Sequence, residues 1–212
     1  MPPTAVRVDD RRTRRRRGLH TSGRVSEPST GFGPGIGAGP GRRLRCAKSE
    51  WGDDMCLKCQ GLTDAEVRAH YLDLIEEHGW AICNVGPGPV SPPMAYTIGM
   101  TRFHGHPELL ISGLDPSDAA PVLNDLAAEV RDGHAFVVGD VIGAGRPHPY
   151  RVIEVWSPRR LVWAQEIYGG PNRRVIPAFQ FVWADHDGRW PWQRHARDPH
   201  QQLFGRAPSG SG

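Results

Sequence analysis

The stretch AYTIGMTRFHGHPELLISGL, residues 95–114, decides the fold. Residues 95–100 and 108–112 are apolar runs of strand length, and the histidine-rich segment between them reads as a turn. The connections that precede these two strands are too short to hold a crossover helix. The stretch therefore predicts antiparallel strand pairing.

Upstream of this stretch, the sequence predicts a helix over residues 64–78 and a strand over residues 80–85. Thr63 and Glu66 have the spacing of a capping box, and Gly79 supplies the left-handed residue that ends a helix. The Gly-Pro-rich residues 86–93 can continue neither kind of element, so they indicate a loop.

Downstream, Asp115 and Pro116 form a helix start, and Gly133 supplies the stop. Strands are expected over residues 136–141, 150–156 and 176–183. A short helix that carries Leu161, Val162, Trp163 and Tyr168 is expected to end at Gly169. Together these elements predict an α+β domain, mainly antiparallel, as a partly closed small β-barrel or sheet with two to three flanking helices.

Composition divides the 212 residues near Met55. Residues 1–54 carry 12 Lys and Arg against 6 Asp and Glu, whereas residues 55–212 carry 14 against 17. The first part combines an arginine block with a glycine-rich segment and lacks apolar periodicity, so we expect it to be disordered. It is either a basic nucleic-acid-binding arm or a segment without function, which is then a disordered tail or an over-extended gene start with translation beginning at Met55.

The sequence therefore predicts one folded domain over residues 55–204 and a flexible C-terminal tail over residues 205–212. No run of 18 or more apolar residues is present, so we expect no membrane-spanning helix and a cytoplasmic protein. Nucleophile-elbow, kinase and zincin motifs are absent from the sequence, which leaves hydrolase, kinase and metalloprotease activities without support.

Between residues 55 and about 204, an ordered series of short motifs resembles a bacterial family known as domain of unknown function 4262. The motifs are Cys56-x-x-Cys59, His78-Gly79-Trp80, YTIGM at 96–100, HPEL at 106–109, NDLA at 124–127, Tyr168-Gly169, QFVW at 180–183 and GRWPW at 188–192. The resemblance implies neither a reaction nor a cofactor. A Thr-x-Gly strand before a proline-containing turn is also similar to the opening of flavin-binding split barrels, an analogy of fold alone.

Two groups of residues are candidates for metal or acid-base chemistry. Cys56 and Cys59 have the spacing of half a zinc site or of a redox pair, and the alternative is two unengaged thiols near a terminus. His104, His106 and Glu108 could converge on a metal or act as acid and base. The alternative is that His106 and Pro107 only shape the turn.

Aromatic and basic residues suggest a binding site. Trp183, Trp190 and Trp192 lie in one short span, where they either stack on a planar ligand or pack in the core. Arg146 and Arg173 lie in glycine-containing turns, where they either contact a phosphate or remain solvated.

We therefore expect a small planar or phosphorylated ligand to bind between residues 96–106 and 183–192. The expected ligand-binding residues are Tyr96, Thr97, Thr101, His104, His106, Tyr168, Trp190, Trp192, Arg146 and Arg173. A flavin and a zinc ion are the two cofactors left open, and the sequence does not decide whether the protein is an enzyme. The rival is a protein-interaction or immunity-type module, and nucleic acid is expected only through the basic tail.

Overall fold

The computed structural model describes residues 57, 60–145, 148–169, 174–197 and 200–208. The expectations for the basic N-terminal segment, for Cys56 and Cys59, and for Arg146 and Arg173 lie outside the described residues.

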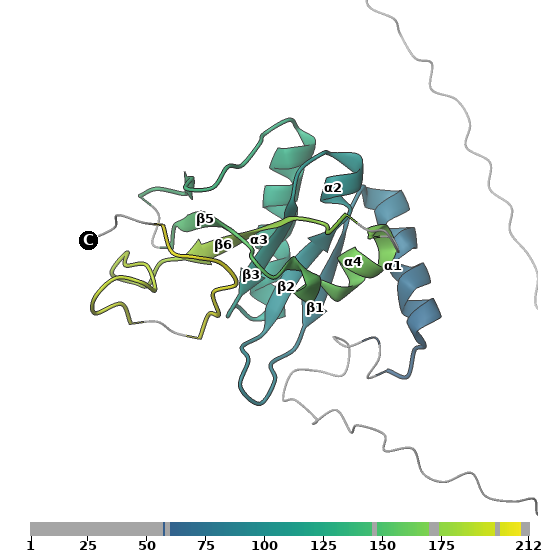
Figure 1. The fold of residues 1–212 in the computed structure, drawn as a ribbon, viewed down its shortest axis with the longest axis horizontal. Coiled ribbons are helices and arrows are strands. Elements are labelled where there is room, and N and C mark those ends of the chain that lie inside the picture. Colours follow the sequence, from purple (N-terminus) through teal and green to yellow (C-terminus); the bar gives the residue numbers. More distant parts are fainter. Residues whose placement is uncertain (1–56, 58–59, 146–147, 170–173, 198–199, 209–212) are drawn as a thin grey trace, which may run out of the picture. The chain divides into compact units, whose positions relative to one another are not determined.

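A six-stranded sheet forms the centre of the described part of the chain (Figure 1). Its order is β1-β2-β3-β6-β5-β4. The strands are β1 (Ala81–Val85), β2 (Met94–Ile98), β3 (Glu108–Ser112), β4 (Val141–Ile142), β5 (Tyr150–Glu154) and β6 (Ala178–Trp183). Every neighbouring pair is antiparallel except β3 and β6, which are parallel.

The α+β class and the mainly antiparallel pairing are thus confirmed, but the sheet is open and no barrel forms. The two end strands, β1 and β4, do not pair with each other. With only two residues, β4 offers too short an edge to close a barrel.

Helices cover both faces of the sheet. They are α1 (Asp64–His78), α2 (Met100–Phe103), α3 (Pro116–Arg131), the 3₁₀ turn η2 (Pro158–Arg160) and α4 (Val162–Tyr168). One core packs the sheet against α1 and α4, and a second packs its other face against α3 (Figure 1). None of the described helices has the length and apolar character needed to cross a membrane.

The boundaries of α1 follow from local chemistry, as predicted. The Thr63 hydroxyl accepts a hydrogen bond from the Glu66 amide at 3.3 Å, and the Glu66 carboxylate accepts one from the Thr63 amide at 2.7 Å. Gly79 adopts φ 89°, which glycine tolerates without strain, and its amide donates to the Ile75 carbonyl.

Two expected strands differ from the structure. The strand expected over residues 136–141 is wrong, because the Asp140 side chain accepts from the Val137 amide at 2.9 Å and bends the chain. Only Val141 and Ile142 form the strand there.

The strand expected over residues 95–100 ends at Ile98. Gly99, at φ 120°, turns the chain into the short helix α2, which the sequence did not predict.

A C-terminal strap, residues 200–205, crosses the sheet. The Gln202 amide donates to the Ser112 hydroxyl at 3.1 Å. The Gln180 side chain donates to the Gln202 carbonyl at 2.7 Å and accepts from the Phe204 amide at 2.8 Å. The strap thereby bonds to both of the parallel strands, β3 and β6.

Candidate functional site

Glu108 begins β3 at the point where β2 and β3 diverge. The regular pairing of the two strands ends at Tyr96 and Leu110. Beyond it, the Leu109 amide donates to the Thr97 hydroxyl at 2.9 Å instead of to a backbone carbonyl. The Glu108 side chain, which has no exposed surface, binds to Thr97 and to the start of α2.

Four hydrogen bonds end on the Glu108 carboxylate. Its Oε2 accepts from the Thr97 hydroxyl at 2.8 Å and from the Met100 amide at 3.2 Å. Its Oε1 accepts from the amides of Gly99 and Thr101 at 3.2 and 3.1 Å. Burial nevertheless raises the pKa of Glu108 to about 7, because the loss of water outweighs these donors.

Glu108 therefore has a structural role, because it holds the start of β3 to Thr97 and to the start of α2. Each oxygen already accepts two hydrogen bonds, and the residue is fully buried, so a substrate proton has no access to either oxygen. The carboxylate instead supplies acceptors for amides that a four-residue helix leaves unpaired at its start.

The two neighbouring histidines point away from Glu108. The His104 ring lies against Trp80, edge to face, with 6.3 Å between ring centroids. His106 packs between Phe136 and Phe179, with 5.8 and 5.7 Å between ring centroids. The arrangement therefore does not bring His104, His106 and Glu108 to one point. Among the described residues no three His, Cys, Asp or Glu side chains are grouped as metal ligands.

His106 has the environment of a neutral imidazole. Its Nδ1 lies 2.7 Å from the Pro107 carbonyl, which can only accept, so the hydrogen of the neutral ring is on Nδ1. Burial lowers the pKa of the ring, and Nε2 has no hydrogen-bond partner among the described residues.

The other predicted residues near Glu108 are mostly interior. Tyr96 is in the core, where its hydroxyl accepts from the Trp163 amide at 3.2 Å and burial raises its pKa. The Thr101 hydroxyl is buried and lacks a partner in the described part of the chain. Tyr168 is half-buried, and burial followed by the charge of Glu108 raises its pKa. The structure thus gathers Thr97, Thr101 and Tyr168 around Glu108.

Trp190 and Trp192 lie in a different place, the loop of residues 184–197 that follows β6 (Figure 1, yellow). Their rings stack at 5.8 Å with an interplanar angle of 13°. Trp190 is only 9 % exposed, so packing accounts for that ring. The Arg151 guanidinium also lies over Trp190, at 5.9 Å from its centroid.

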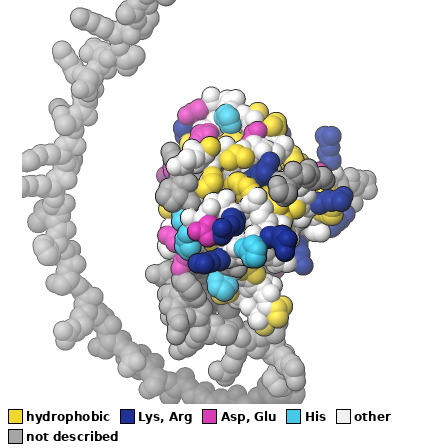
Figure 2. All heavy atoms as spheres, turned by 90° about the vertical axis from the view of Figure 1, so that its left-hand side faces the viewer, with side chains coloured by type: hydrophobic (Ala, Val, Ile, Leu, Met, Phe, Trp, Pro, Cys, Tyr) yellow, Lys and Arg dark blue, Asp and Glu magenta, His cyan; other side chains and the backbone are white. Residues whose placement is uncertain are grey.

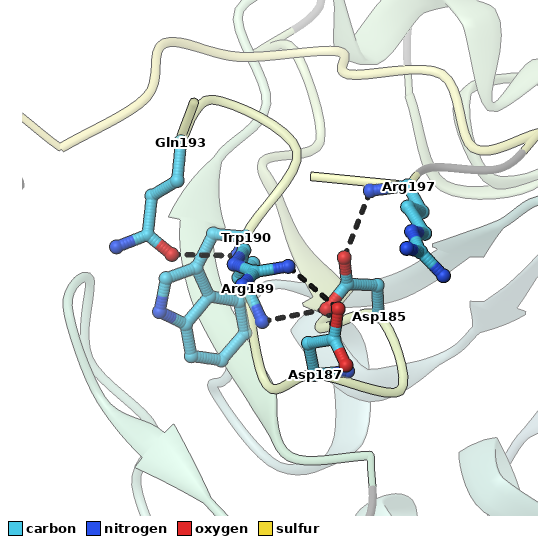
Figure 3. Close-up of polar contacts among 6 residues, drawn as sticks. All are labelled: Asp185, Asp187, Arg189, Trp190, Gln193 and Arg197. Atoms are coloured by element: carbon cyan, nitrogen blue, oxygen red, sulfur yellow. Dashed lines mark hydrogen bonds and ion pairs between the residues drawn. The ribbon is translucent and has the colours of Figure 1, made fainter. Parts of the chain in front are cut away.

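Asp185 holds this loop in shape (Figure 3). Its Oδ1 accepts from the amides of Asp187 and Arg189, and its Oδ2 accepts from the Arg197 amide, at 2.8 to 3.0 Å. The Arg197 amide, followed by the other donors, lowers the pKa of Asp185. The Gln193 side chain accepts from the Trp190 amide at 2.8 Å and closes a second turn.

The outer side of the loop is charged. Figure 2 shows arginine, histidine and acidic side chains close together on this face. Arg189 pairs with Asp187 at 2.6 Å, whereas no described carboxylate pairs with Arg194 or with the side chain of Arg197. This loop follows the end of β6, and Glu108 lies at the start of the parallel β3. The residues expected to form one site are therefore divided between opposite ends of the sheet.

Two hollows contain residues that the sequence reading did not select. One, of about 610 Å³, lies where β5 ends and β6 begins; its lining includes Trp156, Arg159, Pro177 and Phe179. The other, of about 590 Å³, lies between α1, β1 and α3; its lining includes Glu77, Trp80, Asn124 and Arg131.

A long-range contact explains why the second hollow was missed. The Trp80 indole donates to the Asn124 side chain at 3.0 Å, and these residues are 44 positions apart. Both positions are within motifs that carried the family resemblance, but nothing in their spacing indicates that they meet.

A family model described as "Domain of unknown function (DUF4262)" matches residues 74–197, more than half of the chain. The chain belongs to this family. The resemblance seen in the sequence is thus confirmed, and the DUF4262 match includes Glu108, the Asp185 loop and the hollow beside Trp156. No curated protein and no solved structure matches the chain significantly.

Proposed function

We propose that this domain binds a small planar anionic ligand in the hollow beside Trp156. The expected chemistry, a planar or phosphorylated molecule, is that of the sequence analysis, but the site is a different one. Its volume of about 610 Å³ is in the usual range for small-molecule sites. The proposal concerns binding alone and includes no reaction.

The exposure of Trp156 carries the proposal. Its side chain is 63 % exposed although tryptophan is usually well buried in a folded domain. It lines a hollow whose other walls include Val175, Pro177 and Phe179. An indole held at the edge of an apolar hollow offers a face on which a planar ring can stack.

Arg159 is the reason to expect a negatively charged ligand. This arginine lines the same hollow, and no described carboxylate forms an ion pair with it. Arg160 is adjacent in sequence and Arg174 precedes the lining residue Val175, so the surroundings favour an anion. Glu154, which is exposed, is the acidic member of the lining and disfavours a second negative group near it.

Fluorescence titration with flavin mononucleotide and adenosine monophosphate, two planar rings that carry phosphate, tests the proposal. Trp156→Ala and Arg159→Gln should each weaken binding roughly tenfold, since stacking and a charge-assisted hydrogen bond are each lost. Phe103→Ala and Arg194→Gln are matched controls, because these exposed residues are outside the hollow. Failure of both probes to bind saturably, or unchanged binding by the Trp156→Ala variant, would contradict it.

A further inference from the structure

The outer edge of β1 is open. β1 pairs with β2 along one side, and in the part of the chain that the structure describes no strand pairs with its other side. The edge of a sheet presents backbone donors and acceptors, to which another extended chain can add as a further strand. This edge is a site separate from the hollow beside Trp156.

A groove follows this edge. The hollow of about 590 Å³ between α1 and α3 includes Ala81 and Ile82 of β1 in its lining. Leu74, Glu77 and His78 form its α1 wall, and Ala120, Asn124 and Arg131 form its α3 wall. An extended chain that pairs with β1 would therefore have a helix beside each of its two faces.

The groove has a fixed wall before any partner binds. The hydrogen bond from Trp80 to Asn124 holds the indole against α3, and the Arg131 guanidinium lies over the ring at 5.8 Å. Trp80 is itself only 8 % exposed, so it acts as a wall and not as a free ring for stacking. A wall that is already ordered reduces the entropy lost on binding.

The two walls carry opposite charges. The Glu77 side chain on the α1 wall is 72 % exposed, and the Arg131 side chain on the α3 wall is 52 % exposed. Glu77 lies 3.8 Å from His78, and Arg131 bonds to Asp132 at 2.9 Å, so both charges are partly compensated. Both side chains nevertheless remain more than half exposed at the groove.

We propose that the outer edge of β1 binds an extended segment of a partner protein that carries a basic side chain toward Glu77 and an acidic one toward Arg131. Successive side chains of a strand point to opposite faces, and α1 and α3 lie on opposite faces of this sheet. The two charged residues of the partner are therefore an odd number of positions apart.

Charge argues against a second copy of this chain as the occupant. An antiparallel pairing of β1 with its own copy about a two-fold axis keeps the two α1 helices on the same face. On the face of Glu77, the copy would then present its own Glu77 and not its Arg131, and on the face of Arg131 it would present its own Arg131. The charges of the two grooves therefore do not complement each other, which disfavours self-pairing.

The proposed binding of a partner segment to the edge of β1 can be tested by selection from a displayed library of random peptides, with the full chain as bait. Peptides of about eight residues are long enough to span the five residues of β1. Selected peptides should carry opposite charges an odd number of positions apart. Amide exchange of β1 should slow when they bind, and N-methylation of alternate peptide amides should abolish binding.

Charge reversal distinguishes this site from others. Glu77→Lys and Arg131→Glu should each weaken binding roughly fivefold or more, and a peptide with the corresponding charge reversed should restore it. Glu76→Lys and Arg194→Glu are matched controls, because both residues are exposed and outside the groove lining. Thermal unfolding of all four variants checks that the fold is retained.

Three outcomes would overturn the proposal. The first is a failure to enrich any peptide above background, and the second is enrichment of peptides that bind the Glu77→Lys variant equally well. The third is binding that appears only when residues 1–54 are removed or when a dimer is dissociated, which would make the chain itself the occupant. Loss of flavin mononucleotide binding by Trp156→Ala is independent of all three.

Discussion

At the scale of single residues, Glu108 is the most consequential position. A carboxyl that has no exposed surface and accepts four hydrogen bonds is the kind of group often taken for a catalytic acid or base. In the ionised form of Glu108, every lone-pair direction is used within the fold. The raised pKa of Glu108 therefore affects the stability of the fold and not catalysis. It makes the free energy of unfolding depend on pH near neutrality.

Glu108 should make the protein less stable as pH rises from about 4.5 to about 7. Its pKa of about 7 in the folded state exceeds the ordinary 4.5, so the folded state keeps a proton that the unfolded state releases. The loss is at most roughly 3 kcal/mol and is complete above the folded pKa. Urea unfolding at about pH 5 and about pH 8 measures it.

The Glu108→Gln variant should not show this loss of unfolding free energy as pH rises. Glu129→Gln, at an exposed position, is the control and should keep the loss. His106 acts in the opposite direction. Its lowered pKa gives stability that is present above the ordinary value of 6.5 and lost as pH falls below it. An identical difference between about pH 5 and about pH 8 in wild type and Glu108→Gln would show that Glu108 titrates normally in the fold.

Thr97 and Thr101 provide a matched pair of hydroxyls. Thr97→Val should lower the free energy of unfolding by roughly 1–3 kcal/mol, because the buried Leu109 amide loses its acceptor and Glu108 loses a donor. Thr101→Val should change it by less than about 0.5 kcal/mol, since its buried hydroxyl has no partner among the described residues. Equal losses in urea unfolding would contradict the assigned hydrogen bonds.

At the scale of elements, one carboxylate connects the turns of the loop of residues 184–197. Asp185 accepts from three backbone amides that belong to different turns of the loop. The stacked Trp190 and Trp192 rings are carried by the segment between two of those amides. Asp185 therefore fixes the backbone that carries the aromatic pair, while packing holds the Trp190 ring itself.

Asp185→Ala should increase amide hydrogen exchange across residues 185–197 roughly tenfold or more, because three amides lose their acceptor together. Asp187→Ala removes only the ion pair with Arg189 and should leave the exchange near the wild-type rate. Exchange measured by mass spectrometry on peptides from this loop decides between the two. Similar exchange rates in the two variants would contradict the role of Asp185 in holding this loop.

Elements with local signals were predictable from sequence. α1 has its capping box and its terminal glycine, and the start of α3 has Asp115 and Pro116 in the expected places. The prediction of a strand over residues 136–141 was wrong because the Asp140 side chain accepts a hydrogen bond from the Val137 amide. Such side-chain bonds compete with the backbone bonds of a sheet, and apolar periodicity does not reveal them.

The candidate sites were less predictable, for a physical reason. The exposure of Trp156 depends on which parts of the fold cover the ring, and Trp80 meets Asn124 only through the placement of α3 on the sheet. Likewise His104, His106 and Glu108 are close in sequence, but in the structure each side chain contacts different partners and the three do not form one site. Spacing along the chain does not determine side-chain direction at a turn.

At the scale of the whole described domain, the C-terminal strap connects the central strands. Gly205 lies so close to the Glu154 carbonyl that a Cβ atom has no room. Gly205→Ala should therefore lower the free energy of unfolding by roughly 1–3 kcal/mol, as overpacking does. Gly86→Ala, where nothing lies within 4 Å of the added atom, should change it by less than about 0.5 kcal/mol in the same urea experiment.

The parallel pairing of β3 with β6 has a consequence for folding during synthesis. β3 is complete at Ser112, yet its neighbour begins only at Ala178, and the strap that bonds to both comes after residue 200. On the ribosome, the β3 edge of the β1-β2-β3 sheet stays unpaired, in addition to the open edge of β1, while the later strands are made. We therefore expect the nascent chain to be prone to aggregation until its last segment has left the exit tunnel.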